Sequence, residues 1–549
     1  MYASVAWPLR RAARIMSAGE AIVDGPVRRT WAEVYSRLSR LGDGLERLGI
    51  AHGDRVAVLA HNSGDHLEAW LGLPAQGRVI NDLNLRLAAP ELAFMVDDCE
   101  CAALLIDDDH LDVGRELKAR CPSLRQLVHI GDSEPPRDAI AWGELLNGSP
   151  GPFPELDENA LAAIVYTGGT SGKPKGVMLS HRNLMANAKQ FTLACGHVRS
   201  DRYLHAAPMF HVADTSQSFA MTWAAGTHVI LAGFAADAVA DTIERERITL
   251  TLLVPTMIAM LVDHIDGQQR DLSSLRLLMY AASPMPKETQ RRAMAALDCE
   301  FTQLYGMTEA APLVTQATAE DHRRGAAGEQ PYVSRLDSAG AEVVGVQCEV
   351  CDPDSGEPLA PGEPGEIWVR GPNVMLGYWR REQETRDVLT PDGWYRSGDM
   401  AYADDAGYLY IVDRLKDMII SGGENVYSAE VEAVRVAGCG GVRRVRRSRS
   451  ALGGARTCSR GAESGRRARR GRARRARAGA DRSLQGSALD RAPCRAASEN
   501  RGGQDRQARA ARPTLGGPGA PDSLTDLQPQ ARARVLPCAD NVSIRTDPC

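Results

Sequence analysis

The residues best suited to chemistry lie in a glycine- and hydroxyl-rich loop at positions 164–176, which reads IVYTGGTSGKPKG. Glycines let backbone N–H groups approach an anion closely, while hydroxyl and ammonium groups add donors and positive charge. The loop therefore predicts phosphate binding, with a flexible surface hairpin as the structural alternative. The candidate phosphate-binding residues are Thr167, Gly168, Gly169, Thr170, Ser171, Gly172, Lys173 and Lys175.

This loop is not a Walker A motif, which needs four residues between its first glycine and the Gly-Lys pair. Gly168 and Gly172 are one residue too close for that pattern. Pro174 follows the lysine, and a proline there is incompatible with the helix that a Walker loop opens.

A second stretch, YGMTEAAP at positions 305–312, combines an aromatic ring, a hydroxyl and a carboxylate. Tyr305 supplies the ring and Thr308 the hydroxyl. Glu309 supplies a hard oxygen ligand, which suits a Mg²⁺ ion that also contacts a nucleotide phosphate. The structural alternative is a strand end followed by a helix-capping Thr-Glu pair.

The third stretch, at positions 393–432, contains Asp399, Arg414 and the segment SGGENVY. The carboxylate of Asp399 can accept hydrogen bonds from a ribose diol, and Arg414 can donate to ribose or phosphate. The glycine pair permits close approach of a thin substrate chain. The alternative is two β-turns and a basic loop.

The chain around these stretches alternates buried apolar runs with helical patterns. Such alternation is typical of βαβ units and a parallel sheet, so the expected fold class is α/β. Ser180 is the expected N-cap of a helix over SHRNLMANAK. Expected strands lie at 55–60, 101–108, 126–132, 161–166, 176–179, 227–233, 248–256 and 275–283, and antiparallel strands of a smaller β element at 365–379 and 407–414.

Size and composition place limits on these interpretations. A chain of 549 residues is too long for one core, and 44% hydrophobic with 25% charged residues is ordinary for a globular protein. The N-terminus has no apolar run of signal-peptide length, and no run approaches a membrane span. The 12 cysteines are scattered without paired motifs, so we expect reduced thiols and a cytoplasmic protein.

In order and spacing, the three stretches resemble those of the adenylate-forming (AMP-binding) superfamily, in its acid–CoA ligase branch. The resemblance covers about residues 15–434. It implies a large N-terminal domain of two α/β subdomains and a small β-barrel, followed by a mobile α+β C-terminal domain. The implied boundaries are 1–413 for the N-terminal AMP-binding domain and 414–434 for the hinge and the start of the next domain.

The resemblance also implies roles for individual residues. Thr167 and Glu309 match the Mg²⁺ contacts, and Tyr305 matches the aromatic residue that stacks on adenine, with AASP at 281–284 in place of Gly-Gly-Ala-Pro. Asp399 and Arg414 match the ribose contacts. Further implied residues are Lys416 at the domain hinge, Gly422, Gly423 and Glu424 at the CoA tunnel, and Thr308, Glu309 and His211 in catalysis.

The chemistry implied by the resemblance is acyl transfer in two steps, from MgATP to acyl-AMP and then to CoA. Amino-acid adenylation domains carry an aspartate where this chain has His211, so an amino-acid substrate is not expected. A buried structural histidine is the alternative for that position. The expected substrate is a fatty acid, with an aryl acid of the cinnamate or benzoate type as the alternative. The segment 216–226 is the candidate acid pocket.

The resemblance stops near residue 434. Beyond Tyr427 the chain has no Lys, Phe, Trp, Tyr or Met, and from 435 on it carries 26 arginines against 9 acidic residues. Such a composition cannot build a core, so residues 435–549 are expected to be disordered. One function for an arginine-rich tail is nucleic-acid binding. The corresponding rival hypothesis is a non-catalytic nucleotide-binding protein with a basic tail.

We favour another explanation of the tail, namely a gene translated out of frame. Shifted by one nucleotide in allowed codons, ENRGGQDRQ at 499–507 becomes KTGAGKID, which resembles the superfamily's C-terminal lysine motif. With the same offset, SLQGSALDR at 483–491 becomes YKAPRSIE, another C-terminal-domain pattern. Gln504 then stands over the codon of the catalytic lysine. We therefore expect an impaired ligase whose partners are small molecules and not nucleic acid; a homodimer is compatible with the sequence.

Overall fold

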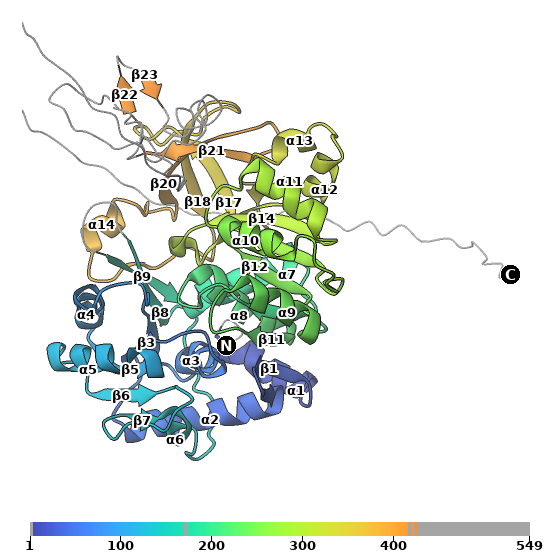
Figure 1. Cartoon of the computed structure of the whole chain (residues 1–549). Coiled ribbons are helices and arrows are strands. Elements are labelled where there is room, and N and C mark those ends of the chain that lie inside the picture. The colour runs from blue at the N-terminus through green and yellow to red at the C-terminus, as the bar shows by residue number, and fades with distance from the viewer. Residues whose placement is uncertain (1–3, 169–173, 416–418, 422–423, 427–549) are drawn as a thin grey trace, which may run out of the picture. The chain divides into compact units, whose positions relative to one another are not determined.

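The computed structural model describes residues 4–168, 174–415, 419–421 and 424–426 (Figure 1). All of them belong to one compact unit, which spans Met1–Ser464. Alternating strands and helices in this unit confirm the α/β class. The division at residues 413 and 434, and the tail at 435–549, concern residues that lie partly or wholly outside the described part.

The first large sheet has eight strands in the order β19-β9-β8-β4-β3-β5-β6-β7. Its strands from β8 to β7 are parallel, whereas β9 and β19 are antiparallel additions at one edge. The bounds are β3 Arg55–Leu59, β4 Val79–Asp82, β5 Cys101–Ile106, β6 Gln126–His129, β7 Ile140–Ala141, β8 Leu161–Thr167, β9 Lys175–Ser180 and β19 Gly377–Tyr378.

The second large sheet has nine strands in the order β16-β15-β14-β13-β12-β10-β11-β1-β2. It is parallel from β14 to β1 and antiparallel at both edges. The bounds are β1 Glu20–Asp24, β2 Val27–Thr30, β10 Arg202–His205, β11 Thr227–Ile230, β12 Leu250–Leu253, β13 Leu277–Tyr280, β14 Glu300–Gly306, β15 Leu313–Ala317 and β16 Ala341–Glu342.

A smaller antiparallel sheet follows in the order β17-β18-β20-β21, with bounds Gln347–Cys351, Gly365–Arg370, Tyr395–Ala403 and Leu409–Arg414. A separate hairpin pairs β22 (Ile419–Ser421) with β23 (Glu424–Val426). The prediction of one β element over 365–379 was only half right. The stretch forms β18 in the small sheet, then leaves it and forms β19 beside β9 in the eight-stranded sheet.

The helices cover the sheets and connect their parallel strands; for example, α5 lies beside β5 and β6 in Figure 1. Their bounds are α1 Ala6–Ile15, α2 Trp31–Arg47, α3 Gly64–Ala75, α4 Ala89–Asp98, α5 Leu111–Arg120, α6 Trp142–Leu145, α7 His181–Ala194, α8 Val212–Ala224, α9 Ala236–Glu246, α10 Pro255–Ile265, α11 Lys287–Ala296, α12 Ala319–Ala326, α13 Tyr332–Arg335 and α14 Glu382–Arg386. Two short 3₁₀ turns are η1 Asp108–His110 and η2 Thr308–Ala310.

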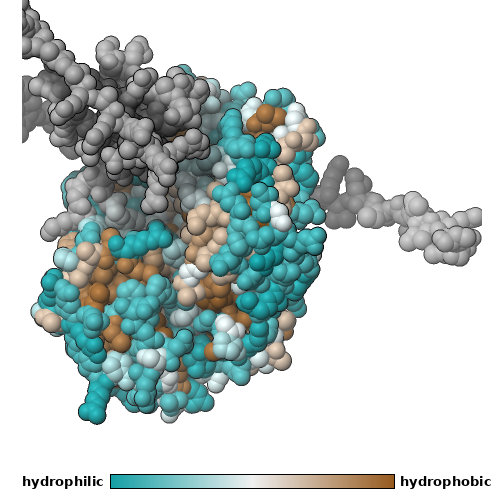
Figure 2. All heavy atoms as spheres, in the orientation of Figure 1, coloured by the Kyte–Doolittle hydropathy of each residue, from teal (hydrophilic) through white to brown (hydrophobic). Residues whose placement is uncertain are grey.

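The local sequence explains several of these elements. Every residue of β5, CAALLI, is buried, as expected of a parallel strand covered on both faces. The prediction for Ser180 is confirmed: its hydroxyl accepts the backbone N–H of Asn183, which completes a capping box at the start of α7. None of the described helices is long and apolar enough to cross a membrane. Most of the face drawn in Figure 2 is hydrophilic, with apolar patches that include the surroundings of α8.

Candidate active site

One cavity of about 750 Å³ is lined by residues from all three predicted stretches. The strand β8 and its following loop contribute from the eight-stranded sheet, β14 and η2 from the nine-stranded sheet, and β20 and β21 from the small sheet. Segments that are far apart in the sequence therefore share one site. The predicted residues on its wall are Thr167, Gly168, Lys175, His211, Tyr305, Thr308, Glu309, Asp399 and Arg414.

Backbone contacts of the segment 372–379 hold these sheets together. Met375 N–H donates to the carbonyl of Glu309 at 2.8 Å, and Leu376 N–H donates to the carbonyl of Met178 at 2.9 Å. The side chain of Asn183 donates to two further carbonyls of the segment, at positions 372 and 374. The segment 372–379 therefore holds η2 next to β9.

Glu309 is a carboxyl group of the site whose pKa is shifted by its surroundings. Its carboxylate accepts a hydrogen bond from the phenol of Tyr378 at 2.9 Å. Burial raises the pKa of the Glu309 carboxyl, and the charge of Asp399 acts in the same direction, whereas the Tyr378 hydroxyl and Lys175 oppose the shift. A partly buried carboxylate whose side-chain hydrogen bond comes from a neutral phenol suits a Mg²⁺ ion, which prefers oxygen ligands. Thr167, which lines the same cavity, offers a hydroxyl.

Tyr305, Asp399 and Arg414 also line the cavity and form a chain of contacts. The phenol of Tyr305 donates to Asp399 Oδ2 at 2.7 Å, and Arg414 Nε lies 3.5 Å from Asp399 Oδ1. The last two residues are direct partners in the register of β20 and β21. Burial raises the pKa of Asp399, while Tyr305 and Arg414 oppose that shift. The aromatic ring of Tyr305 is thus held in place by its hydroxyl.

Lys175 is held by two residues that the sequence did not indicate. Its Nζ lies 3.1 Å from Glu384 Oε2, which belongs to α14, and 4.9 Å from the centre of the Tyr378 ring. Tyr378 belongs to the GYW sequence at 377–379, which has no chemical signature of its own. Glu384 lies among other charged residues, so no sequence signal pointed to it.

His211 lies at the N-cap of α8 and is exposed to the cavity, so it is not a buried structural histidine. Partial desolvation lowers the pKa of its imidazole, and the charge of Arg86 adds to this, against the effect of Asp82. The ring centroid of Phe210 is 5.0 Å from that of His211. The lowered pKa favours the neutral form of this imidazole, which lies at the N-terminus of α8.

The segment 216–226, which we predicted to form the acid pocket, does not line the described cavity. This part of α8 is largely packed into the cores, with Phe219 and Met221 at most 1% exposed. The helix contributes only Val212 and Ala213 to the described cavity. The apolar part of the wall instead combines separate elements: Phe191, Val212, Ala213, Leu252, Ala281, Leu304, Met307 and Leu313.

Several predicted residues lie outside the described part of the chain. Glu424 itself belongs to the described part, where it begins β23 of the separate hairpin. The outlying residues are Gly169, Thr170, Ser171, Gly172 and Lys173 of the glycine loop, Lys416 of the hinge, and Gly422 and Gly423 of the CoA segment.

Comparison with known proteins settles the family. The family model described as "AMP-binding enzyme" matches residues 9–379. The chain belongs to this family. Its relatives include a feruloyl-CoA synthase of Amycolatopsis sp., 39% identical over 433 residues, or 78% of this chain and 81% of the relative. A long-chain-fatty-acid–CoA ligase of Thermus thermophilus is 34% identical, over 77% of this chain and 79% of the relative.

Solved structures agree with this assignment. ATP-bound MatB from Rhodopseudomonas palustris matches with a TM-score of 0.70 and 28% identity, over 81% of this chain and 84% of that one. The protein is therefore an acid–CoA ligase of the AMP-binding family, whose members use ATP and CoA as substrates.

Proposed function

We propose that this AMP-binding enzyme activates a compact aryl carboxylic acid of the hydroxycinnamate type, forming aryl-acyl-AMP and then the CoA thioester. This proposal favours the aryl acid, which was the alternative substrate in the sequence analysis, over the fatty acid, which was the expected one. The relative with the higher identity is a feruloyl-CoA synthase, at 39% against 34% for the fatty-acid ligase. A fatty acid remains the second candidate.

The observation that supports the proposal most directly is the shared cavity. Its volume of about 750 Å³ must hold the nucleotide and the acid together, which favours a compact acid over a long chain. One part of the wall is polar and charged around Glu309 and Asp399. Another part is apolar, with Phe191 and Met307, and suits an aromatic ring.

The residues on the wall then take the following roles in the proposal. Thr167 and Glu309 hold the Mg²⁺ of MgATP, and that ion neutralises charge on the phosphates. Tyr305 supports the adenine, and Asp399 and Arg414 contact the ribose. Lys175 faces the phosphates with the rest of the glycine loop. His211, in its neutral form, lies beside the apolar wall where the acid enters.

The substrate is tested by acid-dependent exchange of pyrophosphate into ATP, measured with ferulate, cinnamate, benzoate, hexanoate and palmitate. The expected result is exchange with ferulate or cinnamate at a kcat/KM at least about tenfold above that for palmitate. Preference for palmitate would reverse the order of the two candidates. Exchange with none of the acids, together with a salt-dependent shift of DNA, would favour the nucleotide-binding protein with a basic tail.

We also propose that residues 1–413 act as one N-terminal domain and that the written C-terminus impairs the ligase. The catalytic lysine of the superfamily has no counterpart after residue 434, where Gln504 stands over its codon. A neutral amide cannot replace an ammonium group that contacts both the acid and the α-phosphate. Losing one preorganised donor commonly costs on the order of 10²–10³ in rate.

A further inference from the structure

Two histidines and an aspartate gather outside the nucleotide cavity, at the carboxyl edge of the eight-stranded sheet. His61 follows β3, Asp107 follows β5, and His110 ends the short turn η1. β3 and β5 are neighbouring parallel strands, with Leu59 opposite Ile106. Because parallel strands end at the same edge, the register itself places the two following loops side by side.

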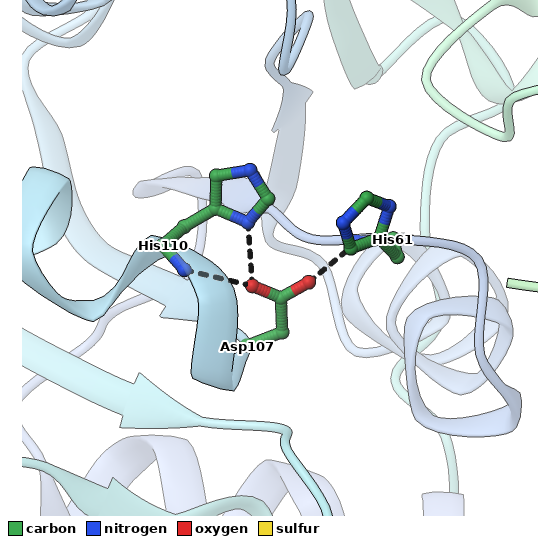
Figure 3. Close-up of side chains that lie close together, drawn as sticks. All are labelled: His61, Asp107 and His110. Atoms are coloured by element: carbon green, nitrogen blue, oxygen red, sulfur yellow. Dashed lines mark hydrogen bonds and ion pairs between the residues drawn. The ribbon is translucent and has the colours of Figure 1, made fainter. Parts of the chain in front are cut away.

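The carboxylate of Asp107 links these loops. Its Oδ2 accepts the backbone N–H of His61 at 2.7 Å, and its Oδ1 lies 3.2 Å from the backbone nitrogen and 2.5 Å from Nδ1 of His110. Figure 3 shows the two imidazole rings on either side of this carboxylate. Their centroids are 5.2 Å apart and their planes are inclined by 51°.

If these residues served only to join the two loops by hydrogen bonds, position 61 would not need a histidine. Asp107 contacts the main chain of His61, and any residue other than proline would supply that N–H. The imidazole of His61 instead reaches Asp109, with Nε2 at 3.3 Å from Oδ2. This side chain is 43% exposed, so the ring is accessible to an ion from solvent.

The charges of the cluster favour a cation. Three consecutive aspartates each face a different histidine: Asp107 faces His110, Asp108 faces His129 and Asp109 faces His61. Within the described residues, neither Asp107 nor Asp109 forms an ion pair with a lysine or arginine. With neutral imidazoles, two carboxylates thus give the cluster a net negative charge.

The spacing approaches that of a metal site. One ligand atom each from His61, Asp107 and His110 can be chosen so that all lie within 4.8 Å of one another. Two metal–ligand bonds of roughly 2.0–2.2 Å at a tetrahedral angle place the ligand atoms about 3.3–3.6 Å apart, so the exposed His61 ring must rotate toward the other two ligands when the ion binds. Two imidazoles with carboxylates suit a borderline transition-metal ion, whereas Mg²⁺ and Ca²⁺ prefer oxygen ligands alone.

We propose that His61, Asp107 and His110, with Asp109 as a further carboxylate, bind one divalent transition-metal ion of the zinc class. The bound ion links the loop after β3 to the turn after β5. This site is separate from the nucleotide cavity, whose lining includes none of the four residues.

The test uses the full chain after treatment with a chelator, titrated calorimetrically with Zn²⁺ in excess Mg²⁺. We expect His61→Ala to weaken one Zn²⁺ site by at least about tenfold, and His61→Ala/His110→Ala to remove it. Both substitutions keep the backbone N–H groups that bind Asp107. His52→Ala is the matched control, since His52 is an exposed histidine near the amino end of β3.

A second readout follows from linkage: Zn²⁺ should raise the Tm of the wild-type chain and of His52→Ala, but not that of the double variant. Co²⁺ should give a visible absorption band that depends on His61 and His110. The proposal is overturned if the wild-type chain binds no Zn²⁺, or if the double variant binds the same number of ions with the same affinity.

Discussion

At the residue scale, Glu309 combines two properties that oppose each other. Burial raises its pKa, so the charged form is disfavoured in the folded chain, yet a carboxyl group binds Mg²⁺ best as the charged carboxylate. Glu309→Gln keeps the size of the side chain and an acceptor for the Tyr378 hydroxyl. We expect pyrophosphate exchange to fall by roughly 10²–10³, while the Tm at neutral pH rises.

The pH dependence of this gain identifies its cause. The folded pKa of Glu309 lies above the unfolded value, so folding favours the protonated carboxyl, and wild-type stability falls as the pH rises through that interval. The advantage of Glu309→Gln in Tm should therefore vanish at acidic pH. The exposed Glu382 provides a control, since Glu382→Gln should alter neither activity nor Tm. Unchanged exchange, or a lower Tm at neutral pH, would contradict this account.

Ala282 makes a different residue-scale prediction, about backbone strain on the cavity wall. Its φ is +74°, a left-handed conformation that costs a residue with a Cβ roughly 1–2 kcal/mol. Ala282→Gly removes that strain, but the greater freedom of glycine stabilises the unfolded chain by about 0.5–1 kcal/mol, so we expect a net gain in stability of up to about 1.5 kcal/mol. Urea unfolding measures the gain. The neighbour is a matched control: Ala281→Gly has no such strain to relieve and should destabilise.

The sequence indicated some residues of the site much better than others. Tyr305, Glu309, Asp399 and Arg414 lie in stretches whose side chains suggest nucleotide chemistry, and the structure places all four on one cavity. Glu384 shows no such signal, because its place in the cavity depends on a long-range event. Its helix follows β19, whose pairing with β9 brings the helix close to Lys175, and no local pattern encodes that pairing.

At the scale of elements, α14 holds the ammonium group of Lys175 through Glu384. If Lys175 contacts ATP phosphates, Glu384 competes with them for the same charge. Glu384→Gln should lower the KM for ATP by up to about fivefold, since a partly exposed ion pair is worth roughly 1 kcal/mol. Lys175→Met should raise that KM, and Glu382→Gln on the same helix should leave it unchanged. A higher KM in Glu384→Gln would show that Glu384 supports nucleotide binding instead.

The hydrophobic pattern of the sequence predicted the strands better than it predicted the orientation of α8. The parallel strands were predictable because runs such as β5 are apolar throughout. In α8, every residue from Asp214 to Thr222 is buried, polar and apolar alike, so this part of the helix has no exposed polar face that would reveal its orientation. Composition suggested a pocket at 216–226, but packing against the cores on several sides took up those side chains. Orientation of a fully buried helix is decided by tertiary contacts and not by its sequence.

At the scale of the whole molecule, we expect the cavity to bind the nucleotide and the C-terminal region to supply a catalytic group. Among the described residues, the groups that we propose to contact the nucleotide line one cavity and lie between positions 167 and 414. In the superfamily that this chain resembles, a lysine from the C-terminal domain completes the adenylation step. The written chain should therefore bind MgATP at this cavity and still turn over slowly.

Restoring the reading frame tests this division of labour. Residues 435–549 are replaced by the sequence that the shifted frame encodes, and exchange of pyrophosphate and formation of the thioester are both measured. We expect each rate to rise by at least about 10²–10³, because an ammonium group again meets the α-phosphate. Changing that restored lysine to alanine should return exchange to the level of the written chain while ATP affinity stays similar. If the written chain already forms thioester as fast as the restored one, the adenylation chemistry needs only groups within the first 434 residues.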